Sequence, residues 1–348
     1  MENLQIGSHL IGGGQPTFII AEAGSNHNAD LGTALRLIDV AAEAGADAVK
    51  FQIFSAETLY SRFAPRLSEM EGRSKPGETP FELIQRVELP REWIPQLAEC
   101  ARKKGILFCA TPFDLAAVEQ LKAVDVPFFK IASYEIVDTV LLRAVARTGK
   151  PAIISTGNSS LADIETALEI FRASGNEQVA LLHCVSQYPA RYEDVNLRCI
   201  QTLRQAFEVV VGFSDHTTDA VTGVAAVALG AKIVEKHYTL SRNQPGPDHG
   251  FSLEPHELAQ YVRDLRHGEQ ALGNGIKRVM PSELENHRLA RRSIHARVPI
   301  RRGTRVEMDM LCIKRPALGI EPREIDRVIG RVARTDIEQD AWITWEML

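Results

Sequence analysis

Short runs of apolar residues alternate with longer amphipathic segments over the first three quarters of the chain. Each apolar run ends abruptly in polar residues, which is typical of buried strands in a parallel sheet. The segments between the runs repeat their apolar residues at helical spacing. The predicted strands are 17–21, 48–53, 107–110, 128–132, 151–157, 179–184 and two runs that begin at Val209 and Lys232, and the predicted helices include 33–44, 220–229 and 255–272.

This alternation predicts an α/β fold. Eight strand and helix units over about 270 residues match a (β/α)₈ TIM barrel. An open, doubly wound sheet would show the same alternation, but it would need a glycine-rich phosphate loop directly after its first strand. Gly12, Gly13 and Gly14 precede that strand instead, so the barrel is favoured.

The pattern changes after residue 272. Glycine, asparagine and proline punctuate residues 273–281, which predicts a linker. Short β-like runs follow, and 300–311 aligns with 337–348 as an internal repeat. We therefore predict a catalytic barrel domain at 1–272, a linker at 273–281 and a small, duplicated β-rich domain at 282–348.

Composition narrows the classes of function. The chain of 348 residues carries 40 basic and 45 acidic side chains, a net charge of −5, which argues against nucleic acid or an anionic membrane as the main partner. No stretch has the pattern of a membrane span or a secretory signal, and the five cysteines lack a CxxC spacing. We expect a cytoplasmic protein with reduced thiols.

Two lysines at the ends of apolar strands are candidates for chemistry. Lys50 and Lys130 stand where buried side chains are expected, and an unpaired buried ammonium is costly. An anionic ligand would remove that cost, or else the lysines pair with Glu22 and Glu135 in a structural ion network. Hydroxyl groups at neighbouring strand ends would complete a phosphate and carboxylate pocket: Thr111, Ser133, Ser155 and Ser214.

Two histidines follow consecutive predicted strands. His216 and His237 would leave the same edge of a parallel sheet, close enough to share a divalent metal. A site with two histidines leaves positions open for substrate and water, which suits catalysis. We expect His183 to be a packed or pocket-wall residue. Surface positions are expected for His249, His256, His267 and His287.

One connection is unusually long. About 35 residues separate the strand at 48–53 from a helix that begins near Pro90. Long polar connections on the strand-end side of a barrel are often functional. We therefore expect residues 54–80 to form a mobile lid.

The order of these motifs resembles the bacterial sialic acid synthase family. The resemblance covers nearly the whole chain, and the tail from residue 282 resembles the family's C-terminal antifreeze-like (SAF) domain. The matching motifs lie at 21–27, 49–52, 111–113, 129–133, 154–157, 182–184, 212–219, 235–237 and 246–248.

This resemblance implies an activity, namely condensation of phosphoenolpyruvate with the open-chain aldehyde of an N-acetylmannosamine-type sugar. The products would be a nine-carbon 2-keto acid and phosphate. His216 and His237 would hold a divalent ion, Mn²⁺ or alternatively Mg²⁺, which polarises the aldehyde oxygen for attack by C3 of the enol. Water would then add at C2 with Glu22 as base, and phosphate would leave by C–O cleavage.

The resemblance also implies substrate contacts and a partner. The phosphoenolpyruvate pocket would comprise Lys50, Thr111, Lys130, Ser133, Ser155 and Ser214. The sugar would face Gln52, Glu135, Tyr188 and Asp248. Arg315 matches an arginine that the small domain inserts over the barrel mouth of the other subunit, which implies a domain-swapped homodimer.

One position leaves the sugar open. The chain has Ser186 where the sialic acid enzymes of the family have asparagine. Synthases for legionaminic, pseudaminic or spore-coat sugar acids therefore remain alternatives. A synthase of the 3-deoxy-octulosonate phosphate class is disfavoured by the tail, and a non-catalytic carbohydrate-binding relative is disfavoured because Glu22, the two lysines and the two histidines are all present.

Overall fold

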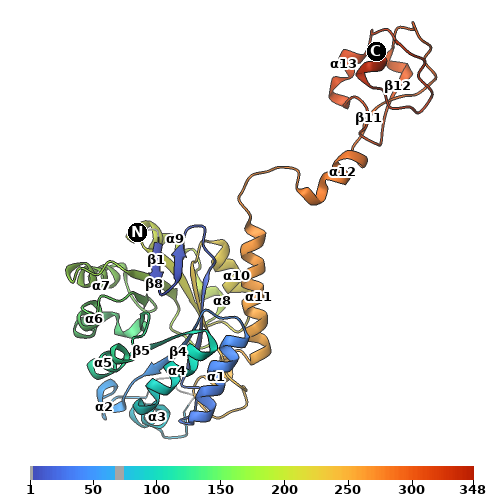
Figure 1. Cartoon of the computed structure of the whole chain (residues 1–348). Coiled ribbons are helices and arrows are strands. Elements are labelled where there is room, and N and C mark those ends of the chain that lie inside the picture. Colours follow the sequence, from blue (N-terminus) through green and yellow to red (C-terminus); the bar gives the residue numbers. More distant parts are fainter. Residues whose placement is uncertain (1–2, 67–73) are drawn as a thin grey trace. The chain divides into compact units, whose positions relative to one another are not determined.

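The chain forms two compact units, Met1–Gly273 and Asn274–Leu348 (Figure 1). The computed structural model describes residues 3–66 and 74–348. Among these residues, no helix is both long enough and apolar enough to cross a membrane.

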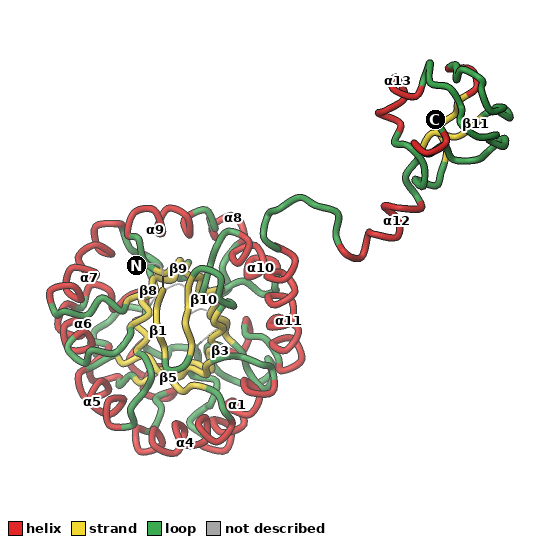
Figure 2. The backbone as a smooth tube through the Cα atoms, turned by 45° about the horizontal axis from the view of Figure 1, so that its top comes forward, coloured by secondary structure: helices red, strands yellow, loops and turns green. Residues whose placement is uncertain are grey.

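Parallel strands of the first unit curve into a barrel (Figure 2). Its described residues form eight strands in the order β5-β4-β3-β10-β9-β8-β7-β6, and the two end strands, β5 and β6, lie in contact. The predicted TIM barrel is confirmed. The strands are β3 (Phe18–Gly24), β4 (Ala48–Ile53), β5 (Leu107–Pro112), β6 (Phe129–Ile131), β7 (Ala152–Ser155), β8 (Val179–Cys184), β9 (Val210–Asp215) and β10 (Ile233–His237).

Helices surround the barrel on its outside (Figure 2). They are α1 (Leu31–Glu43), α4 (Ile94–Lys104), α5 (Leu115–Ala123), α6 (Thr139–Ala146), α7 (Leu161–Ala173), α8 (Tyr192–Val195), α9 (Cys199–Phe207), α10 (Val221–Ala228) and α11 (Pro255–Leu272). Side-chain caps fix several of their starts. Asp30 accepts a hydrogen bond from the Thr33 N–H of α1, and Asp114 accepts one from the Ala117 N–H of α5.

Alternate side chains of each strand point into the barrel. Toward the amino ends these inward side chains are apolar, and they form one cluster with a hairpin made of β1 (Asn3–Ile6) and β2 (His9–Gly12). The hairpin contributes Leu4, Ile6 and Ile11 to that cluster. The outward side chains pack against the helices in a second cluster. The amino end of the barrel is therefore plugged, and the polar residues are left for the opposite end.

The long connection after β4 is partly helical. It contains α2 (Ala56–Leu59) and α3 (Pro80–Val87). A capping box between Thr79 and Glu82 starts α3, and Phe81 and Val87 of this helix are buried. Residues 67–73 of the predicted lid lie outside the described residues, so the lid stays a prediction.

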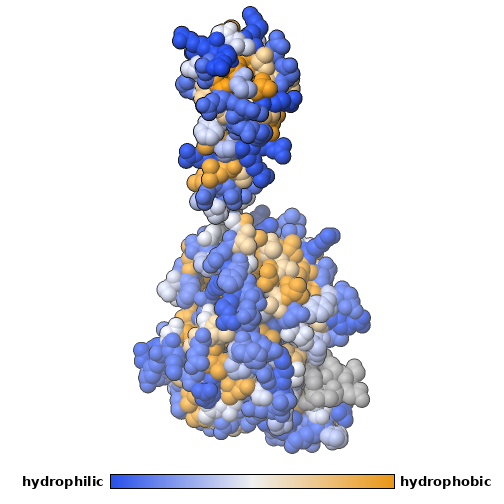
Figure 3. All heavy atoms as spheres, turned by 90° about the vertical axis from the view of Figure 1, so that its right-hand side faces the viewer, coloured by the Kyte–Doolittle hydropathy of each residue, from blue (hydrophilic) through white to orange (hydrophobic). Residues whose placement is uncertain are grey.

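The second unit has its own small core around one antiparallel pair, β11 (Ser293–Ala296) and β12 (Leu311–Lys314). Its helices are α12 (Leu284–Leu289) and α13 (Ile325–Val328). Ile300 and Ile337, the first residues of the two halves of the predicted repeat, exchange backbone hydrogen bonds of 2.9 and 2.8 Å, and both halves contribute to the core. The duplication itself stays a prediction. Figure 3 shows apolar patches on the surface of this unit. Its exposed apolar side chains include Leu284, Leu289, Met308 and Trp342.

Candidate active site

Polar side chains gather at the carboxyl ends of the barrel strands, the end at which TIM barrels place their chemistry. The register pairs Glu22 with Lys50 on one side and with His237 on the other. The strands supply Glu22, Lys50, Gln52, Thr111, Lys130, Ser155, Ser214 and His237, and the segments after them supply Ser133, Glu135, Ser186, Tyr188, His216 and Asp248. The barrel thus brings together all the predicted site residues except Arg315.

Four charged side chains form a buried cluster in this layer. Lys50 Nζ lies 3.0 Å from Glu22 Oε2 and 3.4 Å from Glu235 Oε1, and Lys130 Nζ lies 3.8 Å from Glu235 Oε2. The expected pairing of Lys50 with Glu22 is present. The acidic partner of Lys130 is Glu235 rather than Glu135, because Glu235 is the inward residue of a strand whereas Glu135 lies in the turn after β6.

Burial and charge act in opposite directions on the two carboxyl groups. Burial raises the pKa of Glu22, and the nearby Lys50 only partly offsets that effect. Burial also disfavours the ionised form of Glu235, but the ammonium groups of Lys130 and Lys50 outweigh it and lower the pKa of Glu235 to about 2. Glu22 is therefore the better proton acceptor of the pair, while Glu235 stays ionised.

Hydroxyl groups lie beside both lysines. Lys130 donates a hydrogen bond to Ser155 Oγ at 2.6 Å, and Lys50 donates one to Thr111 Oγ1 at 3.4 Å. Ammonium and hydroxyl donors that converge in this way can surround a phosphate or carboxylate group.

The rings of His216 and His237 are neighbours, with centroids 5.5 Å apart. Nδ1 of His216 lies 2.7 Å from the Val185 carbonyl oxygen, which can only accept, so Nδ1 is the donor. In the neutral ring Nε2 then carries the lone pair, and it lies 3.4 Å from Ser214 Oγ. The ring of Tyr188 packs against His216 at a centroid distance of 4.1 Å.

Gly24 leaves a small space between three predicted site residues. A Cβ at this position would lie 3.0 Å from Asp248 Oδ2, 3.5 Å from Glu22 Oε1 and 3.6 Å from His237 Cε1. The φ of +53° also favours glycine. Both the backbone and the available space therefore require glycine beside the carboxylates and the imidazole.

Ser186 and Ser133 converge on Gly157. A Cβ on Gly157 would lie 2.4 Å from Ser186 Oγ and 2.9 Å from Ser133 Oγ. Ser186 Oγ is buried and has no hydrogen-bond partner among the described residues. Glu135, from the same turn as Ser133, is also largely buried, and burial raises its pKa to about 7.

Other histidines are engaged elsewhere. His183 is packed as expected, with Nε2 donating to the Val195 carbonyl at 2.6 Å. The surface prediction is wrong for His249, which is 1% exposed and bonds to Thr239 Oγ1 at 2.6 Å and to Asn28 Oδ1 at 3.2 Å. A 3₁₀ turn after β10 folds this ring inward. The exposed histidines are His256, His267 and His287.

Comparisons with known proteins agree with this geometry. A model of the NeuB family matches residues 37–277, and a model of the SAF domain matches residues 291–348. The chain belongs to the NeuB family. The resemblance drawn from the motifs is thereby confirmed, and the chain is an enzyme of this synthase family.

Individual NeuB-family relatives cover almost the whole chain. It is 40% identical to the N,N'-diacetyllegionaminic acid synthase of Campylobacter jejuni, over 94% of this chain and 98% of that protein. It is 38% identical to the human N-acetylneuraminate-9-phosphate synthase, over 97% and 94%. The crystal structure of N-acetylneuraminic acid synthetase from Leptospira borgpetersenii in complex with citrate superposes with a TM-score of 0.72 at 41% identity, covering 82% of this chain and 94% of that one.

The residues fit the divalent metal that membership of the NeuB family implies. The described residues contain no group of three or more metal-ligating side chains, so a closed structural site is not formed within them. An open site of two imidazoles matches a catalytic metal better. The hydrogen bond from His216 Nδ1 to the Val185 carbonyl is the kind of contact that orients a metal-binding histidine.

Arg315 is the predicted site residue that this barrel does not contain. It is exposed, directly after β12 in the SAF domain. Its predicted contact is with the barrel mouth of a second subunit.

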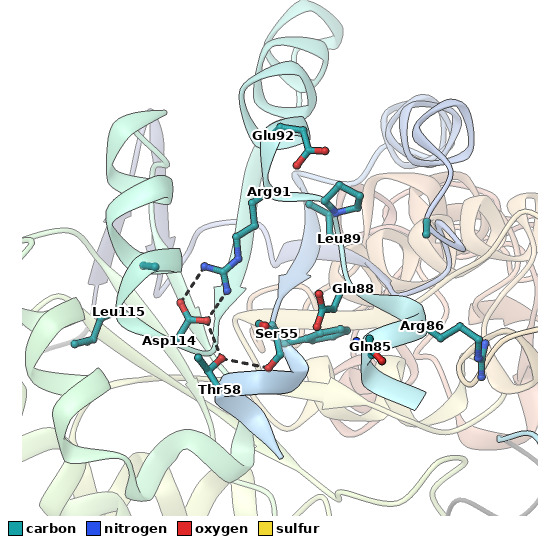
Figure 4. Close-up of a pocket in the computed structure, with 14 residues that line it drawn as sticks. Ser55, Thr58, Gln85, Arg86, Glu88, Leu89, Arg91, Glu92, Asp114 and Leu115 are labelled. Carbon is teal, nitrogen blue, oxygen red and sulfur yellow. Dashed lines mark hydrogen bonds and ion pairs between the residues drawn. The ribbon is translucent and has the colours of Figure 1, made fainter. Parts of the chain in front are cut away.

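A separate hollow of about 930 Å³ lies between the segments that follow β4 and β5 and the segment that precedes α4 (Figure 4). Figure 4 shows Arg91 directed at Asp114, with Nη1 donating to Oδ1 at 3.1 Å, and Thr58 donates to the same carboxylate at 3.0 Å. These charged groups are already paired, and none of the predicted site residues lines the hollow. The hollow is therefore distinct from the candidate active site.

Proposed function

We propose that the chain condenses phosphoenolpyruvate with the open-chain aldehyde of an N-acetylmannosamine-type sugar. C3 of phosphoenolpyruvate forms the new bond to the aldehyde carbon. Water then adds at C2, and phosphate leaves with the oxygen that bridged C2 and phosphorus. The products are a nine-carbon 2-keto sugar acid and inorganic phosphate.

The observation that carries this proposal is the buried pair of lysines beside a carboxylate and two imidazoles at one barrel mouth. Lys50 and Lys130 present donors together with Thr111 and Ser155. An incoming phosphate or carboxylate would take up these donors. The names of the NeuB-family relatives support the same class of reaction.

Glu22 is the proposed base for the water that adds at C2. Its pKa is raised by burial, which brings it nearer to the pH at which a carboxylate transfers protons efficiently. Lys50 lies 3.0 Å from one oxygen and Gln52 donates to the other at 2.7 Å, so the carboxylate has a fixed orientation. Glu235 stays ionised between the two lysines and favours their charged forms, which opposes the burial that lowers the pKa of Lys130.

His216 and His237 are the proposed ligands of a divalent ion, Mn²⁺ or alternatively Mg²⁺. When bound, such an ion supplies Lewis-acid polarisation of a carbonyl oxygen. The sugar hydroxyls would be oriented by Gln52, Glu135, Tyr188 and Asp248.

The identity of the sugar is a finer proposal. The relatives named above act in the legionaminic and N-acetylneuraminate series, so both N-acetylmannosamine and a 2,4-diacetamido hexose are candidate substrates. Ser186 Oγ is buried without a partner among the described residues, so a sugar group or a bridging water would satisfy its hydrogen bond. We propose that N-acetylmannosamine is turned over and that a 2,4-diacetamido hexose is also accepted.

Phosphate release tests the proposed function. Purified protein with Mn²⁺ and phosphoenolpyruvate would be mixed with a panel of N-acylated hexosamines and, for comparison, with a phosphorylated pentose. We expect release only when an N-acylated hexosamine is present, and none after chelation of the metal. Release with the phosphorylated pentose alone would favour a synthase of the 3-deoxy-octulosonate phosphate class.

We also propose a domain-swapped homodimer in which Arg315 reaches the barrel mouth of the second subunit. The exposed apolar side chains of the second unit support burial against another chain. Arg315→Ala should raise the KM for the sugar more than that for phosphoenolpyruvate, because its donors suit an acyl or hydroxyl oxygen. Mixing it with Glu22→Ala should restore partial activity, since one hybrid site keeps both residues. Absence of rescue after demonstrated subunit exchange would contradict the swap.

A further inference from the structure

A second polar network lies on the opposite side of the two strands that lead to the histidines. Asp215 and Lys236 immediately precede His216 and His237, and strand alternation directs their side chains outward, toward the helices. They are register partners across β9 and β10. Asp215 Oδ2 lies 3.0 Å from Lys236 Nζ, and both side chains are at most 1% exposed.

This ion pair also holds the chain directly after His216. Asp215 Oδ1 accepts from the Thr217 N–H at 3.0 Å and from its hydroxyl at 2.8 Å. Lys236 donates to the Thr217 carbonyl at 2.5 Å and to the Asp219 carbonyl at 3.2 Å. The residues on both sides of His216 are therefore tied to the strand that ends in His237.

The outer helices complete the network. Tyr261 of α11 donates to Asp215 Oδ2 at 2.8 Å, and Thr222 of α10 donates to Oδ1 at 3.1 Å. Gly223 makes room for the tyrosine, because a Cβ there would lie 2.3 Å from Tyr261 Oη. Asp215 is thus held from a neighbouring strand and from two helices.

We propose that the network of Asp215, Lys236 and Tyr261 sets the spacing of His216 and His237 and thereby the affinity for the divalent metal. A buried ion pair adds little net stability, but its geometry is specific. A metal held by only two protein side chains depends strongly on their separation, since productive sites tolerate errors of about 0.5 Å. The residues named are positioning residues, and the inference rests on the metal assignment made above.

The chain offers a matched control at the other end of the barrel. Asp47, just before β4, accepts from the Ile19 N–H at 2.7 Å and from Arg266 of α11 at 2.9 Å. It therefore also ties α11 to the strands, but next to the apolar plug and not next to the histidines. Asp47→Asn weakens a comparable contact, and we expect it to leave the spacing of the imidazoles unchanged.

The test measures Mn²⁺ binding to the full chain without substrates, from the electron paramagnetic resonance signal of the free ion. Asp215→Asn should bind Mn²⁺ about 10-fold more weakly, the lower end of the effect seen for groups that orient metal ligands. Tyr261→Phe should show a smaller loss of Mn²⁺ affinity. If Asp215→Asn does not fold, Tyr261→Phe alone tests the positioning role. Asp47→Asn should bind as the unmodified protein does, and the KM for phosphoenolpyruvate should stay unchanged in all three variants.

Two failures can be told apart. If the unmodified protein binds Mn²⁺ and His216→Ala does not weaken binding, the metal assignment of the proposed function is wrong. If His216→Ala abolishes binding while Tyr261→Phe and any folded Asp215→Asn bind as tightly as Asp47→Asn, the network only supports the fold and the positioning role is overturned.

Discussion

The inward face of the barrel differs between the two ends of the same strands. On β3, Ile20 belongs to the apolar cluster, and two residues further along Glu22 belongs to the charged layer. On β10, Ile233 and Glu235 repeat this change. The amino half buries apolar surface against hairpin residues such as Ile6, whereas the carboxyl half buries charges that must be paired.

Stability and chemistry therefore depend on different halves of the barrel interior. Apolar burial stabilises the fold, while buried ion pairs contribute little net stability. Substitutions in the amino half should therefore change the free energy of unfolding and leave catalysis intact. Substitution of the histidines in the carboxyl half should mainly change catalysis, whereas removal of one partner of a buried ion pair there should also destabilise the fold.

The largest expected effect is in the carboxyl half. His216→Ala or His237→Ala should lower turnover by several orders of magnitude while the protein stays folded, because each removes one of two proposed metal ligands. Steady-state rates and circular dichroism would be measured together. Full activity of both variants in chelator-treated buffer would contradict the metal assignment.

In the amino half the change should appear in stability. Ile6 is fully buried in the plug, so Ile6→Ala should lower the free energy of unfolding by about 2–5 kcal/mol. Urea unfolding would measure the loss. The kcat of the folded fraction should equal that of the unmodified protein, and a large loss of kcat would show that the two halves are not separable.

A buried carboxyl group in the carboxyl half should make stability depend on pH. Burial raises the pKa of Glu135 from 4.5 to about 7, so the folded protein keeps a proton that the unfolded chain has lost. The stability that this group contributes is complete below pH 4.5 and is lost as pH rises through about 7. Relative to Glu135→Gln, the unmodified protein should lose up to about 3 kcal/mol between pH 5 and pH 8. Parallel stability curves for the two proteins would argue against the raised pKa.

The smallest expected effect concerns the choice of sugar. Asparagine at position 186 offers both a donor and an acceptor on a longer side chain than serine. Ser186→Asn should shift relative kcat/KM toward N-acetylmannosamine and away from 2,4-diacetamido hexoses by about 1–3 kcal/mol. An equal effect on every sugar would show that Ser186 does not read the substrate.

Much of the site could be predicted because strand order and alternation are local properties. The two histidines were found because they directly follow consecutive predicted strands. A polar residue two positions beyond an inward apolar residue enters the barrel mouth, as Lys50 and Lys130 do after Ala48 and Phe128. The same rule points to Glu235, two residues after Ile233, but its role between the lysines depends on distances across three strands. Sequence alone could not assign it.

Other features depend on tertiary packing and gave no local signal. His249 lies in a polar loop, and only the fold of that loop against Thr239 and Asn28 buries it. Phe251, whose ring centroid lies 5.2 Å from that of His237, was missed for the same reason. The helix α3 was not predicted from the sequence, because most of the surrounding stretch is polar. Thr79, Pro80 and Glu82 nevertheless form a recognisable helix start.

We propose that phosphoenolpyruvate reacts at this barrel mouth with cleavage of its C–O bond. This proposal is tested most directly with phosphoenolpyruvate that carries ¹⁸O in the bridge between C2 and phosphorus, incubated with the protein, Mn²⁺ and N-acetylmannosamine. The bridging ¹⁸O should leave entirely in the released phosphate, and a nine-carbon keto acid should form in equal amount. Retention of ¹⁸O at C2 of the product, or phosphate release without any keto acid, would contradict the proposal.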